Sequence, residues 1–209
     1  MIHPSVPTVT TAEAPVGLPI TPGVPGVPGA PELPGHWLSD RLTPVDPRRW
    51  FVLHTRSRQE KAVVTQLESL GALCFLPLVD HLRKHGQRQR KAHVSLPLFP
   101  GYVFLCGSAE QAYAVDRSKR LVSLITVHDQ PRLDWELKNL YLALAHHTPL
   151  DPYPYLRQGI RAVVKSGPMR GLEGVIDGRI RVDRLILQVD LLGRAVCMEI
   201  DGNLLEPLE

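Results

Sequence analysis

The segment LFPGYVFLCG, residues 98–107, decides how this chain folds. Proline removes a backbone donor and glycine weakens a strand interior, so Pro100 and Gly101 punctuate the apolar run instead of joining its ladder. The apolar residues that follow, Tyr102 to Leu105, are typical of a strand. We therefore expect the chain to bend at the Pro-Gly pair and to present Phe99 and Tyr102 at the mouth of that strand.

Outward from this strand, the periodicity predicts the order β-α-β-β-α-β followed by a further helix. The expected strands are WFVLHT (50–55), ALCFLPLV (72–79), LFPGYVFL (98–105) and LVSLITV (121–127), with a polar, basic hairpin connection over 81–95. Right-handed crossovers fold this order into a four-stranded antiparallel sheet with helices on one face, the ferredoxin-like arrangement. The predicted fold class is α+β.

Three polar positions mark where the helices begin. Ser57 and Glu60 have the spacing of a capping box at the start of the first helix, and Ser108 and Gln111 have it at the second. Asp134 is expected to cap the third helix.

The last part of the chain predicts a second domain. TPLDPYPYL (148–156) contains three prolines, so we take 148–157 as a semi-rigid linker. Four short strands are expected beyond it, at IRAVVKS (160–166), EGVID (173–177), LILQVDL (185–191) and AVCMEID (195–201). Short strands at this spacing favour a small β-barrel over 158–209.

Residues 1–47 have a different composition. They hold eleven of the twenty prolines and five glycines, and Trp37 is their only aromatic residue. Such a segment cannot bury enough apolar surface to offset its ordering entropy. We predict a disordered extension, either a plain flexible one or a docking tail, so the first folded domain is expected over 48–147.

Positive charge is concentrated in the middle of the chain. Residues 48–147 carry 15 Lys and Arg against 8 Asp and Glu, whereas 1–47 have a net charge of −3 and 148–209 of −1. Between Asp80 and Glu110 there is no acidic residue, but there are five cations: Arg83, Lys84, Arg88, Arg90 and Lys91. Such a loop can hold a phosphate backbone, or it can be a hairpin tip kept soluble by charge. Arg56, Arg58 and Lys61 form a second basic group.

Other features exclude several classes. Cys74, Cys106 and Cys197 lie in apolar runs and predict reduced core thiols, which suit a reducing cytoplasm. The sequence has neither a membrane-span-length apolar stretch nor the pattern of a secretory signal. We predict no metal site and no cofactor, because the histidines lack HExxH or paired-cysteine spacing, and no enzyme, because nothing resembles a nucleophile with its base. The glycines at 167, 171 and 174 lack the GK[ST] of a phosphate loop and are expected at barrel corners.

The order of motifs resembles the NusG family of transcription elongation factors. A basic hairpin is followed by PLFPGYVF, a linker and VVKSGPMRGLEGVI, and the resemblance runs from about Trp50 to Glu209. It implies a NusG N-terminal domain followed by a KOW domain, an SH3-like barrel. The RQEK run (58–61) and the PLFPGYVF spelling are more similar to specialised paralogues of the RfaH type. The GPMRGLEGVI pattern and the β-branched last strands predict a stable barrel and not an α-helical hairpin.

The resemblance implies that the protein binds RNA polymerase, at the clamp helices of the largest subunit. The residues expected to line the groove for these helices are Trp50, His54, Phe99, Tyr102 and Phe104. Strand alternation buries about half of such a set, and it favours Phe51 and Phe104 as core residues. Phe99 and Tyr102 are then the groove anchors.

Two further sites follow from the resemblance. The resemblance implies that DNA of the transcription bubble is contacted by the hairpin cations and by the group Arg56, Arg58 and Lys61. Ser57 and Arg58 depart from the RfaH-type sequence at this place. In the barrel, Met169, Arg170 and Leu172 occupy the loop that would dock Rho or a small-subunit ribosomal protein. Leu172 can equally plug the end of the barrel.

These features predict a monomeric, cytoplasmic bacterial factor that promotes processivity or antitermination as a specialised NusG paralogue. The alternatives are a housekeeping NusG that couples pausing and termination, and a ribosomal or RNA-binding KOW protein. The aromatic FPGYVF strand argues against the last, because a plain RNA-binding barrel does not need the attached ferredoxin-like domain.

Overall fold

The computed structural model describes residues 48–85, 90–177 and 183–208. The strands are β1 (Arg49–Thr55), β2 (Leu73–Phe75), β3 (Leu78–His85), β4 (Arg90–Pro97), β5 (Tyr102–Gly107), β6 (Leu121–Thr126), β7 (Asp151–Tyr153), β8 (Ile160–Val164), β9 (Glu173–Ile176), β10 (Arg184–Val189), β11 (Arg194–Glu199) and β12 (Leu205–Pro207). The helices are α1 (Glu60–Ser69), α2 (Ala109–Asp116) and α3 (Gln130–Ala145), with short 3-10 turns η1 (Asp190–Leu192) and η2 (Gly202–Leu204). The α+β class is therefore confirmed.

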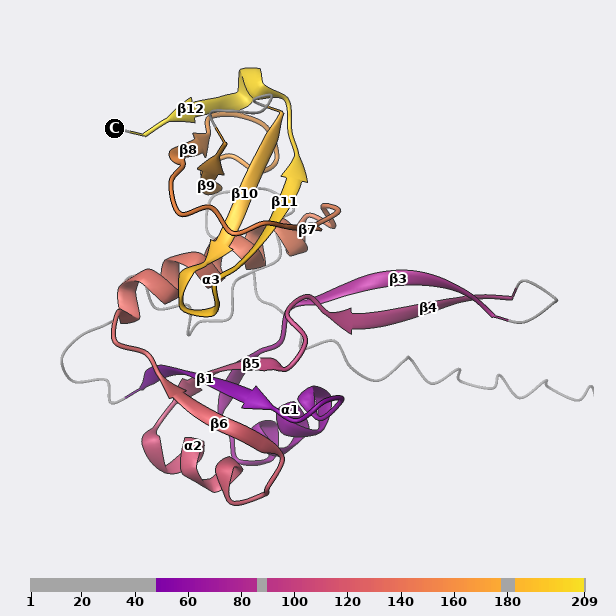
Figure 1. Cartoon of the computed structure of the whole chain (residues 1–209), viewed down its shortest axis with the longest axis vertical. Coiled ribbons are helices and arrows are strands. Elements are labelled where there is room, and N and C mark those ends of the chain that lie inside the picture. The colour runs from indigo at the N-terminus through magenta and orange to yellow at the C-terminus, as the bar shows by residue number, and fades with distance from the viewer. Residues whose placement is uncertain (1–47, 86–89, 178–182, 209) are drawn as a thin grey trace, which may run out of the picture.

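The N-terminal sheet has the strand order β2-β5-β1-β6. All of its neighbouring strands are antiparallel, with β1 between β5 and β6. This is the order that the β-α-β-β-α-β pattern predicts when β2 and β5 serve as its second and third strands. Figure 1 shows α1 and α2 together on one side of this sheet.

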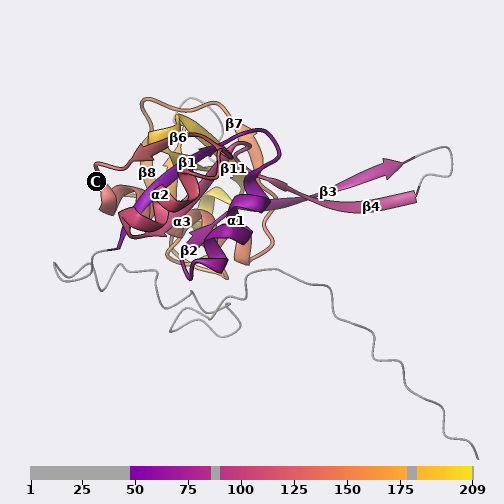
Figure 2. The same ribbon diagram turned by 90° about the horizontal axis from the view of Figure 1, so that it is seen from below.

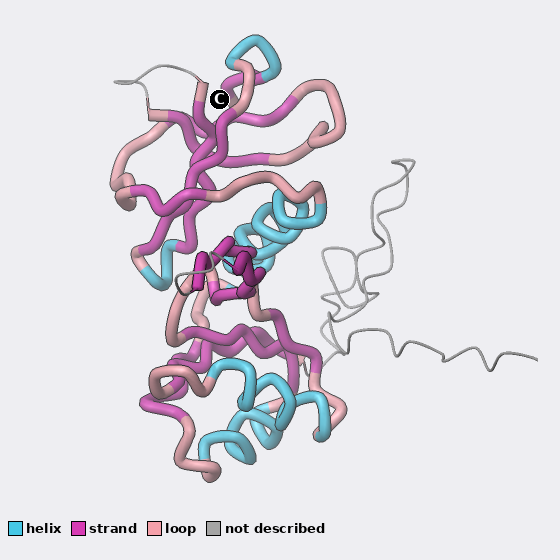
Figure 3. The backbone as a smooth tube through the Cα atoms, turned by 90° about the vertical axis from the view of Figure 1, so that its right-hand side faces the viewer, coloured by secondary structure: helices cyan, strands magenta, loops and turns pink. Residues whose placement is uncertain are grey.

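Both faces of the N-terminal sheet are covered, which corrects the expectation of helices on one face. Strand alternation sends Leu53 and Val103 into the core beneath α1 and α2. It sends Val52 and Phe104 to the opposite face, where they share a core cluster with Leu137 of α3. Figures 1 and 3 show α3 on that second face, between this sheet and the C-terminal strands.

The connection expected over 81–95 is mostly strand. The segment expected as one strand over 72–79 divides at Leu76 and Pro77, so β2 joins the main sheet while β3 pairs with β4 in a separate two-stranded ribbon. Proline offers no backbone donor to a ladder, which accounts for the break. In Figures 1 and 2 the ribbon projects away from the rest of the described chain.

The C-terminal strands form a six-stranded antiparallel sheet in the order β12-β8-β9-β10-β11-β7. Its four central strands are those that the sequence predicts. Side chains from separate strands, including Val164, Leu187 and Met198, meet in one interior cluster. The segment expected as a linker is partly built into this sheet, because β7 pairs with β11 and Gln188 accepts from the Leu156 backbone N–H at 3.0 Å.

Helix α3 joins the two sheets through polar contacts. Asn139 Oδ1 accepts a hydrogen bond from the Glu173 backbone N–H at 2.8 Å. Arg132 Nη2 donates to Asp190 Oδ2 at 2.9 Å, and the Glu136 carboxylate accepts from the Asp190 backbone N–H at 3.3 Å. Because β9 and η1 contribute the partners, the C-terminal sheet is anchored to α3 at two separate places.

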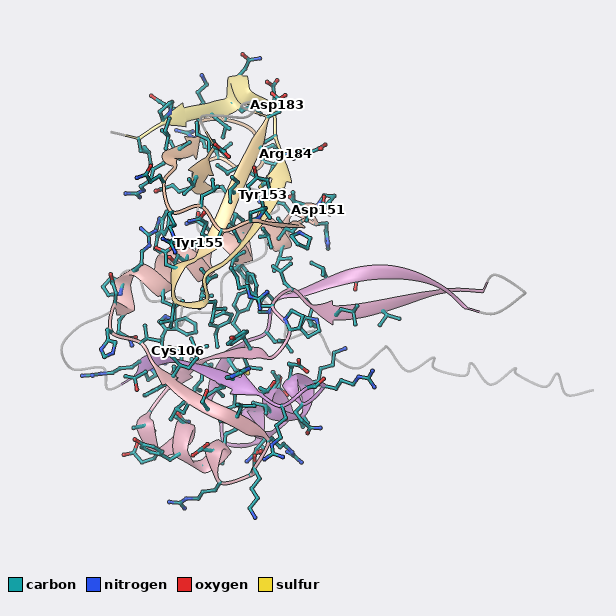
Figure 4. The ribbon with its side chains drawn as sticks, viewed as in Figure 1. Cys106, Asp151, Tyr153, Tyr155, Asp183 and Arg184 are labelled. Carbon is teal, nitrogen blue, oxygen red and sulfur yellow. The ribbon has the colours of Figure 1, made fainter. Side chains whose placement is uncertain are left out.

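Aromatic contacts reinforce this junction. Two guanidinium groups lie over the Trp135 ring, with Arg132 Cζ at 4.9 Å and Arg161 Cζ at 5.1 Å from the ring centroid. Tyr155, labelled in Figure 4, donates its hydroxyl to Asp190 Oδ1 at 3.1 Å. The two parts of the described chain therefore pack against each other through α3.

Two of the three expected helix caps are wrong. Gln111 and Ser108 do form a capping box at α2, but at α1 the residue before the helix is Gln59, which makes no side-chain cap. Helix α3 begins after Asp129, whose side chain accepts from the Arg132 backbone N–H at 3.0 Å. Tertiary partners occupy the side chains of Glu60 and Asp134 instead.

Candidate functional site

The site begins at the turn that precedes β5. The Gly101 backbone has φ +86°, the left-handed region that favours glycine. Its carbonyl accepts from the Thr55 backbone N–H at 2.8 Å, and its own N–H donates to Glu60 Oε1 at 2.8 Å. The Tyr102 N–H closes the turn by donating to the Phe99 carbonyl at 3.2 Å. The Pro-Gly bend that the sequence predicts is therefore held from the end of β1 and the start of α1.

This turn places two aromatic rings side by side. His54 and Tyr102 are opposite each other in the β1–β5 register, and their rings stack with centroids 4.9 Å apart. Both side chains are half-buried. The register of β1 on β6 also shifts between His54 and Thr55, and such a bulge re-aims nearby side chains.

The stacked pair lies at the end of the sheet face that α3 covers. Strand alternation places Trp50, Val52 and His54 on the same face of β1. On that face, Trp50 donates its indole N–H to Asp134 of α3 at 2.8 Å. His54 is four residues beyond that contact. The rings of His54 and Tyr102 therefore form a partly exposed aromatic surface at one end of an otherwise buried face.

Three of the expected groove residues are core residues in this structure. Trp50 is 3% exposed, Phe99 is 4% exposed and Phe104 is fully buried. For Phe104 this agrees with the alternation argument, but Phe99 does not project into an open groove. All three belong to the cluster that contains α3 and the interior of the C-terminal sheet, so tertiary packing covers them.

Two acidic residues of α3 are buried, Asp134 against the N-terminal sheet and Glu136 against the C-terminal part of the chain. Burial raises the pKa of Asp134, and the hydrogen bond from Trp50 opposes that rise. Burial likewise raises the pKa of Glu136 to about 7, although Arg132 Nε donates to its carboxylate at 2.8 Å. The protonated form of each carboxyl is thus favoured by the fold.

Four of the five predicted hairpin cations belong to the strands of the projecting ribbon. Arg83 and Lys84 belong to β3, Arg90 and Lys91 belong to β4, and Arg88 lies outside the described residues. The register places Lys84 opposite Lys91.

The second basic group is divided by the structure. Arg56 and Arg58 are exposed in the turn after β1, whereas Lys61 donates from Nζ to the Ser95 carbonyl at 3.1 Å. The Arg56 N–H also donates to the Arg120 carbonyl at 2.8 Å, which brings the turn before β6 beside it. That turn carries the exposed Lys119.

Lys119 and Arg120 were not predicted as part of this group. They follow α2, more than 50 residues from Arg56, and no local pattern connects the two turns. Pairing of β1 with β6 joins them. The sequence feature that indicates a basic surface here is the run RSKR (117–120), which has three cations in four residues.

The predicted docking loop of the C-terminal sheet is partly covered. Leu172 is fully buried, as expected for a residue that plugs the sheet interior, while Arg170 is exposed. Met169 is half-buried, and its sulfur accepts from the Thr148 hydroxyl at 3.4 Å. Gly167 and Gly171 both have φ +87°, which agrees with the corner role predicted for them.

Within the described residues, no three His, Cys, Asp or Glu side chains gather as metal ligands would. No helix in the same part of the chain is long and apolar enough to cross a membrane.

Comparison with known proteins gives one family. Residues 48–133 match the family model described as "Transcription termination factor nusG". No curated protein matches the sequence. The solved structure "Domain interaction in Thermotoga maritima NusG" is 23% identical with a TM-score of 0.39, and the match covers 78% of this chain and 98% of that one. The MjSpt4:Spt5 complex in conformation B is 12% identical with a TM-score of 0.27, over 77% of this chain and 97% of that one.

Proposed function

This chain carries a NusG-family domain in residues 48–133, and on that premise we propose that it is a transcription elongation factor that binds RNA polymerase. The finer role that we propose is a specialised paralogue that promotes processivity or antitermination in the bacterial cytoplasm. The contact on polymerase is the pair of clamp helices of the largest subunit, as the family resemblance implies. The protein acts by binding and not by catalysis.

The observation that carries this proposal is the stacked pair His54 and Tyr102. Binding hot spots are enriched in aromatic side chains that are anchored by their neighbours and still partly exposed. Tyr102 is held by the turn behind it and by the His54 ring at 4.9 Å. It can therefore bury further surface against a helix without losing much conformational entropy.

The projecting ribbon supports a nucleic-acid contact. Strands β3 and β4 carry Arg83, Lys84, Arg90 and Lys91, and a run of cations without acidic residues can bind a phosphate backbone. The exposed Arg56 and Arg58 add charge at the start of α1, near Lys119. We propose that both groups face DNA of the transcription bubble once the aromatic surface has docked.

We propose that the C-terminal sheet is a KOW domain that recruits a second factor, Rho or a small-subunit ribosomal protein. Arg170 is the exposed member of the predicted loop. Met169 contacts Thr148 at 3.4 Å, so a partner that needs the Met169 side chain must displace that contact.

The test is a binding titration with purified RNA polymerase. Tyr102→Ala removes the half-exposed ring and leaves the buried Phe99 and Phe104 in place, so the fold is retained. Loss of a central anchor typically costs about 2 kcal/mol, which is roughly a thirtyfold loss of affinity. Tyr113→Ala is the matched control, because Tyr113 is 58% exposed on α2, beneath the other face of the sheet.

Equal affinity of wild type and Tyr102→Ala would contradict the assignment of this surface. Capture of ribosomal subunits without polymerase from cells would favour an RNA-binding KOW protein instead.

A further inference from the structure

Glu60 is a buried carboxylate that does not cap its own helix. It is the first residue of α1 and is 7% exposed. A buried charge is costly unless it is hydrogen-bonded. The partner is the Gly101 backbone N–H, 41 residues further along the chain, at 2.8 Å from Glu60 Oε1. The bond is charge-assisted, and such bonds are stronger than those between neutral groups.

This bond acts on a residue whose conformation needs support. Gly101 has φ +86°, and glycine loses more backbone freedom on folding than any other residue. The Gly101 carbonyl is held by Thr55 and its N–H by Glu60, so both of its polar groups are tied to elements outside the turn. The turn is thereby fixed against the end of β1 and the start of α1.

The residues held by this arrangement adjoin the stacked rings. Tyr102 follows Gly101 directly, and His54 directly precedes Thr55. A Cβ added at Gly101 would lie 3.6 Å from the His54 ring, which shows how closely the turn packs against it. A shift of the turn therefore moves Tyr102 relative to His54.

We propose that Glu60 is a positioning residue: it fixes the Phe99–Tyr102 turn and so sets the stacked His54 and Tyr102 rings in the geometry that binds polymerase. The polymerase part of this inference rests on the proposed function. The adjacent Lys61 contributes in the same sense, because its bond to the Ser95 carbonyl ties the base of the ribbon to α1. The start of α1 thus holds both the aromatic turn and the ribbon.

The experiment uses the full chain and two variants of Glu60. Glu60→Ala removes the acceptor, whereas Glu60→Gln keeps an oxygen that can accept from Gly101. Glu110→Ala is the control, because Glu110 is also a first-turn glutamate but is exposed on α2. The direct measurements are amide hydrogen exchange at Gly101 and the NMR contacts between the rings of His54 and Tyr102.

We expect Glu60→Ala to speed exchange at Gly101 by about tenfold and to weaken the contacts between the rings. Glu60→Gln should restore most of both signals, and Glu110→Ala should change neither. Unchanged exchange and ring contacts in Glu60→Ala would overturn the inference. This arm does not involve polymerase, so it stands even if wild type fails to bind polymerase and the proposed function is lost.

A double-mutant cycle tests the link to binding. Glu60→Ala should weaken polymerase binding about tenfold in the wild-type background and have little effect in Tyr102→Ala, because it acts through that ring. A general loss of stability would weaken binding by the same factor in both backgrounds. That outcome would overturn the positioning role.

Discussion

The buried Glu136 makes the stability of the protein depend on pH in a direction that can be worked out from the structure. Its side chain is 1% exposed. Burial raises its pKa from 4.5 to about 7, and the nearby Asp190 carboxylate adds to the rise, while the hydrogen bond from Arg132 opposes it. The folded chain therefore holds this proton more tightly than the unfolded chain. The contribution of Glu136 to the free energy of unfolding is therefore complete below pH 4.5 and is lost as the pH rises through about 7.

The size of the effect follows from the shift. With one pKa unit equal to about 1.4 kcal/mol, the Glu136 contribution to the free energy of unfolding falls by roughly 2–3 kcal/mol between pH 5 and pH 8. For a chain of this size, that corresponds to roughly 5–10 °C in melting temperature. Glu136→Gln cannot ionise and should lose this part of the pH dependence.

The assay is thermal unfolding of wild type and Glu136→Gln at pH 5 and pH 8. Groups that titrate in both proteins cancel when the two pH-dependent shifts are subtracted. Glu199→Gln is the control, because the Glu199 side chain is 84% exposed on β11 and should leave the pH dependence unchanged. Equal shifts in wild type and Glu136→Gln would refute the reasoning. A shift of opposite sign would mean that the Arg132 contact outweighs burial.

Two further predictions concern the domain junction and the ribbon. Trp135→Ala removes the ring that contacts Arg161 of β8, and at about 0.5–1 kcal/mol for this cation–π contact it should weaken the packing of the C-terminal sheet on α3. Denaturant titration should then give a free energy of unfolding lower by at least this amount, whereas Tyr113→Ala should leave it nearly unchanged. An unchanged free energy of unfolding in Trp135→Ala would contradict the prediction. Replacing Arg88, Arg90 and Lys91 with Ser should lower the slope of log affinity against log salt concentration for the elongation complex by about three, and should reduce readthrough. Polymerase binding at low salt should be retained. A slope and a readthrough equal to those of wild type would show that the ribbon is only a solvated face.

The local sequence pattern determined much of the secondary structure and the sheet topology of this protein. The alternation around residues 98–107, the turn residues and the spacing of apolar positions were sufficient to predict the antiparallel β-α-β-β-α-β sheet, the four central strands of the C-terminal sheet and the capping box at Ser108. They also placed Phe104 in the core and the basic residues on a hairpin. These features depend on residues a few positions apart, where steric and periodic rules apply directly.

The tertiary structure decided the rest, because the partners are distant in sequence. Glu60 meets Gly101 and Trp50 meets Asp134 across 41 and 84 residues, and these contacts override the local capping preferences of both acids. Packing of α3 on the second sheet face buries Trp50, and Phe99 is buried in the core cluster that this packing creates. Which aromatic residues stay exposed is therefore a property of the assembled layers, since burial depends on what packs against a face and not on the strand that forms it.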